Sequence, residues 1–278
     1  MLFKTHFASL LLCAASVLLA QPLCAQLSAP QPTDLASIPA LKDAGLRTYH
    51  FTVEYNDANS VGQIVRRQRV TGDYTRGFPN NEVAWNNVAI ADADGPAAPF
   101  AAPQKRDFME GFRYRDDLPG TMAPDFFKSF PAAAVLERNL VWDTGMFEWF
   151  GQQYLDKLRL NEPFHTGANQ DVKMPGIGTF QNRDVVLEWL GRGRHNGQDC
   201  ALIEYRAFLN PVDIAMSGMT MHARSDYWGQ IWVSLANRQI EYATIYEEVT
   251  GEITLPGRTA AQPVSVFRIG RFEPVAAQ

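Results

Sequence analysis

The chain has 278 residues, 46% of them hydrophobic, and its 17 Phe, 9 Tyr and 6 Trp are enough to fill a large core. The net charge is −5 and the isoelectric point is about 5.6. Because proteins that neutralise phosphates present a basic face, this composition argues against a nucleic-acid partner. The short basic run at Arg66, Arg67 and Arg69 alternates with valines and is typical of a solvated strand face.

The first 25 residues are typical of an export signal. Lys4 and His6 precede the apolar stretch FASLLLCAASVLLA, which has the length of a signal peptide rather than of a membrane span. We expect cleavage after Ala25, and hence a periplasmic or secreted protein with no integral membrane segment. Cys13 and Cys24 lack the small preceding residue of a lipidated bacterial cysteine, so a soluble product is expected rather than a lipoprotein or an anchored protein.

Cleavage would leave Cys200 as the remaining cysteine, which cannot form an internal disulfide. Cys200 opens the apolar stretch CALIEY, and this pattern favours a buried, inert thiol over a nucleophile.

Residues 26–40 are rich in proline, alanine and glutamine and predict a flexible lead-in to a single β-rich domain over 41–278. In LRTYHFTVEY, the side chains of Tyr49, Phe51, Val53 and Tyr55 fall on one face. The break NDANSVG and the continuation QIVRRQRVTGDYTRG predict a hairpin with a longer loop.

Residues 77–125 predict an irregular loop or flap, because Pro96, Pro99 and Pro103 interrupt any ladder in ADADGPAAPFAAPQ. Asp92 and Asp94 begin a calcium-like pattern. However, prolines occupy its fifth and twelfth positions and no glutamate closes it, so no metal site is expected.

Residues 129–159 predict two helices, with Pro131 in a first turn and a cap for the second helix at Asp143 or Thr144. Aromatic and aliphatic side chains recur at helical spacing in the second part and form one apolar stripe: Phe147, Phe150, Tyr154 and Leu158. Such a stripe is normally core, and we expect it to lie across a sheet.

From residue 180 onward the pattern is an antiparallel meander. RDVVLEWLGRGR and DCALIEYRAF flank HNGQ, and Asn-Gly at this place predicts a tight hairpin because both turn positions need positive φ. NPVDIAMSGM is expected to be a loop. Two further strands are expected on either side of ANR, and PVSVFRIGRF supplies a last one.

No motif in the chain defines a catalytic or cofactor site. Gly191, Gly193 and Gly197 lie in a hairpin and have the wrong spacing for a dinucleotide site, so no cofactor is predicted. The sequence has neither a Gly-x-Ser-x-Gly elbow nor a His-Glu-x-x-His helix, and its histidines are scattered singly.

Carboxylates are the remaining chemical candidates. Glu204 lies two residues from Arg206 and therefore on the same strand face. The pair is interpreted as a solvated ion pair or, alternatively, as the polar end of a ligand groove. Glu241, Glu247 and Glu248 are similar, and a close pair of such carboxylates would allow hydrolysis of a glycoside.

Trp228 and Trp232 share one face of a strand whose other face carries Ile231 and Val233. With a two-residue turn at 236–237, Val233 faces Ile240, and a bulge would shift the remaining pairs by one. Two exposed tryptophans would form an apolar surface patch prone to association, so we expect another part of the protein or a ligand to cover their side chains. Either the 129–159 helix or a ligand in a groove would provide this cover.

The predicted fold is mainly β, with some helix: a curved antiparallel sheet or half-barrel meander with an aromatic helical segment packed on one face. This architecture resembles exported carrier proteins that cup apolar ligands in a half-barrel, a likeness that transfers no residues. The leading hypothesis is a non-catalytic binding or carrier protein for an apolar or mixed small ligand, bound by Trp228, Trp232, Glu204 and Arg206. The alternatives are a secreted hydrolase using paired carboxylates and an envelope scaffold that binds a protein partner.

Overall fold

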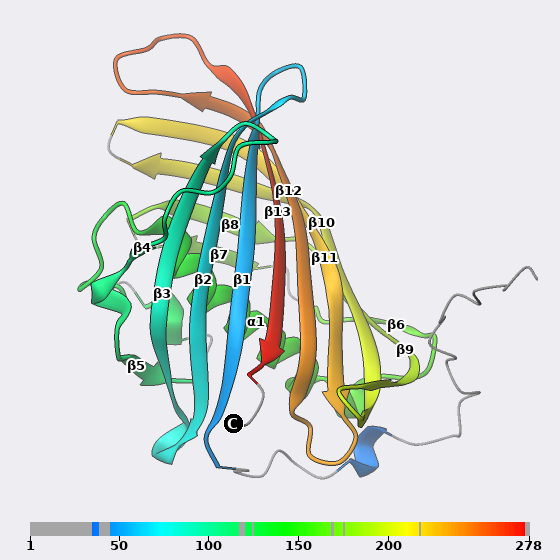
Figure 1. The fold of residues 1–278 in the computed structure, drawn as a ribbon. Coiled ribbons are helices and arrows are strands. Elements are labelled where there is room, and N and C mark those ends of the chain that lie inside the picture. Colours follow the sequence, from blue (N-terminus) through cyan, green and yellow to red (C-terminus); the bar gives the residue numbers. More distant parts are fainter. Residues whose placement is uncertain are drawn as a thin grey trace, which may run out of the picture.

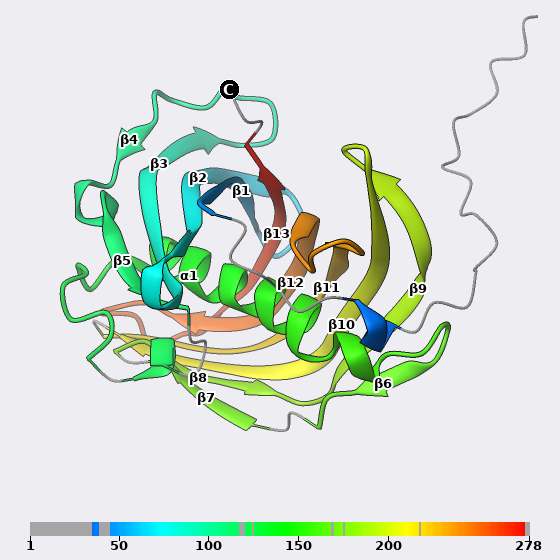
Figure 2. The same cartoon turned by 90° about the horizontal axis from the view of Figure 1, so that it is seen from below.

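The computed structural model describes residues 35–38, 45–116, 120–123, 125–167, 170–174, 176–216 and 218–275. The expected export signal therefore lies outside the described residues. Within them, thirteen strands form one antiparallel sheet that curls around a single long helix (Figures 1 and 2). The predicted fold class is confirmed. None of the helices in the described ranges has both the length and the apolar character of a membrane span.

The sheet runs in the order β4-β3-β2-β1-β13-β12-β11-β10-β8-β7, while β5 pairs with β3 and β9 joins β10 to β6. Its strands are β1 Arg47–Ala58, β2 Ile64–Phe78, β3 Glu82–Asp94, β4 Gln104–Lys105, β5 Phe112–Arg115, β6 Pro163–His165, β7 Gln170–Met174, β8 Gly178–Asn182, β9 Val185–His195, β10 Gln198–Met216, β11 Met219–Ser234, β12 Ile240–Thr254 and β13 Gln262–Pro274.

Two hairpins form as the sequence predicts. β1 and β2 pair along their length, and the alternate residues from Tyr49 to Tyr55 are buried on the concave face. β9 and β10 turn at Asn196 and Gly197, whose φ values of 48° and 77° are those that an Asn-Gly turn requires. Local turn chemistry and a period of two residues are sufficient to specify both hairpins.

The helical region differs from the prediction of two capped helices. α1 (Val135–Glu148) continues without a break into a π-helical turn, Trp149–Gln153. Asp143 and Thr144 lie buried inside α1 rather than at a cap. Thr144 Oγ1 donates to the carbonyl oxygens of Leu140 and Val141, and Asp143 pairs with a distant arginine, so neither side chain caps the start of a second helix.

Two further expectations were wrong. The segment 77–125 is not irregular throughout, because residues 82–94 form β3, which pairs with β2 over most of its length. NPVDIAMSGM is not a loop, since β10 continues to Met216 past a bulge at residues 208–209. The predicted lead-in lies outside the described residues except at 35–38. There, Leu35 is fully buried and Arg238 donates two hydrogen bonds to the carbonyl oxygen of Ile38.

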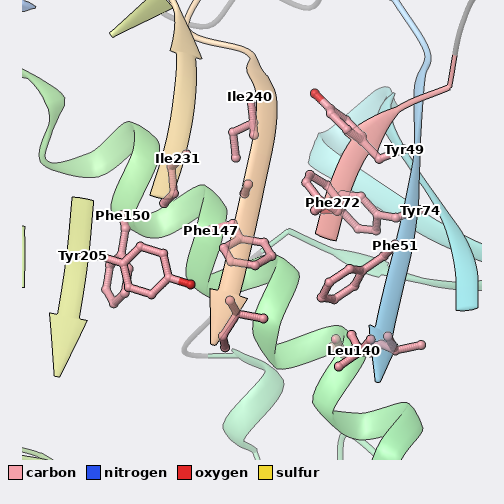
Figure 3. Close-up of a cluster of buried hydrophobic side chains, with 14 of the residues drawn as sticks. Tyr49, Phe51, Tyr74, Leu140, Phe147, Phe150, Tyr205, Ile231, Ile240 and Phe272 are labelled. Carbon is pink, nitrogen blue, oxygen red and sulfur yellow. The ribbon is translucent and has the colours of Figure 1, made fainter. Parts of the chain in front are cut away.

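The core lies between α1 and the concave face of the sheet. Figure 3 shows that Phe147 and Phe150 of α1 and its π-helical extension point toward the aromatic side chains of the strands. Phe147 contacts Phe51 edge-on at 5.8 Å between ring centroids, and Phe150 lies 5.5 Å from Tyr205. The prediction that the aromatic stripe of this segment is core is therefore confirmed.

Candidate functional site: a cavity under the helix

A cavity of about 850 Å³ lies between α1 and the concave face of the sheet. Its walls come from one face of α1, from the inner face of strands β8 to β13, and from β1, β2 and β7. Apolar side chains predominate: Met122, Val135, Leu136, Trp142, Met146, Trp149, Phe150, Val172, Met174, Ile177, Phe180, Val185, Val212, Ile214, Met221, Ile245, Val249 and Val266. The space therefore suits a largely apolar molecule.

An ion cluster around Arg268 of β13 forms the polar part of the wall. Arg268 Nη1 and Nη2 donate to the two carboxylate oxygens of Asp143 at 2.8 and 3.0 Å, and Nε donates to Glu247. Ser225 donates its hydroxyl to the other Glu247 oxygen. One arginine is thus shared between two buried carboxylates from different elements.

Burial changes the acid–base behaviour of this cluster. Desolvation raises the pKa of Asp143 to about 6, although Arg268 acts in the opposite direction. The two carboxylates and the phenol of Tyr55 more than offset the desolvation of Arg268, so its pKa lies above its ordinary value and it stays charged. The polar part of the wall is therefore a buried arginine in direct hydrogen-bond contact with two carboxyl groups.

The wall also contains uncharged polar groups. Asn139 donates an amide hydrogen to the Tyr55 hydroxyl at 3.2 Å, and Tyr227 donates its hydroxyl to Asn182 at 2.7 Å. The indole N–H of Trp142 is buried and has no hydrogen-bond partner among the described residues. Since a buried donor costs free energy when unpaired, this N–H is a natural contact for an acceptor group of a bound molecule.

The two tryptophans singled out in the sequence lie on the opposite, convex face. Trp228 stacks on Tyr246 at 6.0 Å between centroids, and Trp232 lies 5.7 Å from the ring of His195. Both are partly exposed and neither lines the cavity. Of the two covers expected for them, the helix is excluded, because α1 packs on the face that carries Ile231.

The pairing register of β11 and β12 determines which side chains lie next to Trp232. Val233 pairs with Ile240 as predicted, but a bulge shifts the remaining pairs by one, so that Trp232 lies opposite Tyr242. Gly193 gives Trp232 its space, because a Cβ there would come within 2.6 Å of the indole ring. This glycine, which resembles part of a phosphate loop in the sequence, accommodates a neighbouring side chain.

Glu204 and Arg206 also lie on the convex face. They form an ion pair at 2.8 Å, with Glu188 3.4 Å from the same arginine, and all three side chains are partly exposed. The interpretation as a solvated pair therefore fits, and neither residue lines the cavity. Glu241 is buried but belongs to a separate pair with Arg47 outside the cavity.

Within the described ranges, no three His, Cys, Asp or Glu side chains gather as a metal site would require. His50, His165 and His222 each lie within hydrogen-bond distance of one aspartate. These pairs are far apart in the sheet, so each histidine is satisfied locally.

The sequence analysis named Glu247 among its candidate carboxylates, and Glu247 does line the cavity. It missed Arg268 and the role of Asp143, although one signal was present. Val266, Arg268, Gly270 and Phe272 alternate on one face of β13, so the pattern places an arginine among apolar neighbours. A charge at an apolar position of a strand indicates a buried partner. The partner, Asp143, lies 125 residues away and only the fold identifies it.

No family model matches the chain, and no curated protein matches it. A solved structure that it resembles is a DUF1329 family protein from Desulfovibrio piger, with 8% identity over 83% of this chain and 85% of that chain and a TM-score of 0.15. A likeness at this level supports no argument about function, so the case for function depends on the cavity itself.

Proposed function

We propose that this protein is an exported, non-catalytic binding or carrier protein that holds an apolar or mixed small molecule in the cavity under α1. The cavity carries this proposal. Its volume of about 850 Å³ lies within the range typical of small-molecule sites, and its walls combine many apolar side chains with a few polar groups. The apolar segment at residues 7–20 supports export.

The first experiment is native mass spectrometry of the protein purified from its own host compartment. We expect a co-purifying small molecule, and a mature chain that begins near Gln26. The proposal would be contradicted if every preparation lacked a bound small molecule and if the protein bound no apolar molecule added to it.

Two neighbouring residues on β13 provide a matched pair of variants. Val266 lines the cavity, whereas Phe267 belongs to the alternate, outward-facing set of the same strand. Val266→Trp would fill part of the cavity and should exclude the ligand, while Phe267→Trp should retain it. Both variants place a tryptophan on the same strand, one inside the cavity and one outside it.

A secreted hydrolase is the second candidate, because the cavity contains two acids, Asp143 and Glu247. Both are held by Arg268, which favours a structural role over acid–base catalysis. Incubation with a panel of chromogenic glycosides and esters tests this alternative. Turnover that is lost in Glu247→Gln and retained in Glu204→Gln would favour the hydrolase.

A further inference from the structure

The ionisable side chains on the cavity wall are mainly acidic. Four carboxylates line it, Asp57, Asp143, Asp171 and Glu247, against two bases, Lys173 and Arg268. The formal balance is 2 − 4 = −2. Asp171 and Lys173 are exposed at the rim and have opposite charges. The excess of acidic groups in the interior therefore comes from Asp57, Asp143 and Glu247, against the single base Arg268.

Arg268 does not offer a free positive charge to a ligand. Its Nε, Nη1 and Nη2 all donate to Asp143 or Glu247, and Nη1 also lies 3.4 Å from the Tyr55 hydroxyl. A carboxylate or phosphate head group would have to displace one of these acids. It would also lie beside their negative charge, which disfavours binding of an anion.

Asp57 adds a further, unpaired carboxylate. It lies on β1 two residues after Tyr55 and opposite Val266, hence on the same face as the Arg268 cluster and about 7 Å along the strand from Tyr55. Among the described residues it forms no ion pair, because Arg66, its partner in the strand register, pairs with Asp92 at 2.7 Å. Burial raises the pKa of Asp57, and Arg66 offsets this in part.

The cavity wall is also rich in aromatic rings. The wall contains seven of them: Tyr55, Trp142, Trp149, Phe150, Tyr154, Phe180 and Tyr227. The guanidinium of Arg268 already lies 5.8 Å from the centroid of the Tyr55 ring. The combination of aromatic faces with nearby carboxylates is the usual environment for an organic cation, since both attract positive charge and neither requires its complete dehydration.

We propose that the ligand of this cavity is an organic cation, an apolar molecule that carries an amine or quaternary ammonium group, with its charged end directed toward Asp57 and the Asp143–Arg268–Glu247 cluster. This inference rests on the proposed binding function and specifies its ligand class. The apolar body of the ligand would lie along α1, between the helix and the inner face of β10 to β13.

Three amphiphiles with the same dodecyl chain test the ligand class: dodecyltrimethylammonium, dodecanol and dodecanoate. Each is titrated into the protein by isothermal calorimetry near neutral pH and below its micelle concentration. We expect dodecyltrimethylammonium to bind at least about tenfold more tightly than dodecanoate, because a like charge beside buried carboxylates is strongly disfavoured. Dodecanol should bind with intermediate affinity.

Variants separate the cavity from the acidic surface. Asp57→Asn should weaken dodecyltrimethylammonium severalfold and leave dodecanol unchanged. Glu248→Gln removes the same charge from an exposed residue that does not line the cavity, and should change neither affinity. Val266→Trp should weaken all three probes. If the two charge variants behave alike, the cation is attracted by the net charge of the protein and the inference is wrong.

The outcomes distinguish the two proposals. Equal affinities, or tighter binding of dodecanoate, would overturn the cationic ligand class and leave the binding function intact. If none of the three amphiphiles binds, both proposals fail together. If they bind equally to Val266→Trp and to the unmodified protein, their site is outside the cavity and the inference fails.

Discussion

Arg268 of β13 and Asp143 of α1 join the middle of the sheet to the middle of the helix through two hydrogen bonds of 2.8 and 3.0 Å. Both residues are at least nine-tenths buried, and Glu247 of β12 contacts the same guanidinium. A buried ion pair contributes little net stability, but removal of one partner is costly because the charge that remains is uncompensated. The cluster therefore fixes the position of α1 over the cavity.

Arg268→Met should destabilise the protein by about 3–5 kcal/mol at neutral pH, because it leaves two buried carboxylates without a cation. Urea unfolding measures the change. Arg206→Met is a matched control, since Arg206 also contacts two acids, Glu204 and Glu188, but on a partly exposed face. Its cost should be below about 1 kcal/mol. Equal losses in the two variants would contradict a special role for the buried cluster.

The raised pKa of Asp143 predicts a pH dependence of stability. Its pKa is about 6 in the folded protein against an ordinary value of 3.8, so the folded state binds the proton more tightly. The stability contributed by this carboxyl is fully present below about pH 3.8 and is lost as the pH rises through about 6. Asp143→Asn cannot ionise, so the free energy of unfolding of the unmodified protein should fall relative to that of the variant across this range.

The measurement is a series of urea unfolding curves for both proteins between about pH 4 and pH 7. Carboxylates outside the Arg268 cluster contribute equally to the two proteins and cancel in the difference. A difference that does not change with pH would show that Asp143 has the same pKa in the folded and unfolded states.

Cys200 is fully buried, and burial raises the pKa of its thiol to about 12. Thiol reagents should therefore react with the native protein only as it unfolds. Cys200→Ser should cost about 1–2 kcal/mol, because a hydroxyl is buried less favourably than a thiol, and ligand binding should persist. A cysteine introduced at Val61, which is 75% exposed, serves as the rapidly labelled control in a Cys200→Ser background.

Gly193 and Trp232 should be energetically coupled. A Cβ at residue 193 would lie 2.6 Å from the indole ring, so Gly193→Ala should destabilise the protein by about 1–3 kcal/mol. In a Trp232→Ala background most of that cost should disappear, which a double-mutant cycle measures. Trp232→Ala alone should retain the ligand, because this residue lies on the convex face. Additive effects would show that the two residues do not compete for space.

The sequence by itself determined the local features of the fold. The alternation from Tyr49 to Tyr55 specified a half-buried strand, and Asn196-Gly197 specified a hairpin, because both signals depend on residues a few positions apart. The burial of Cys200 and of the aromatic stripe around Phe147 was predictable for the same reason: each lies in a short apolar pattern.

The tertiary structure decided the location of the site. Trp228 and Trp232 share a face in any register of their strand, but the accumulated twist and curl of many strands determine which face of the sheet is concave. Asp143, buried inside α1, likewise has its partner in Arg268, which only folding brings into contact. Because long-range pairing sets both the curvature and the buried charges, the cavity has no signature within any single segment of the chain.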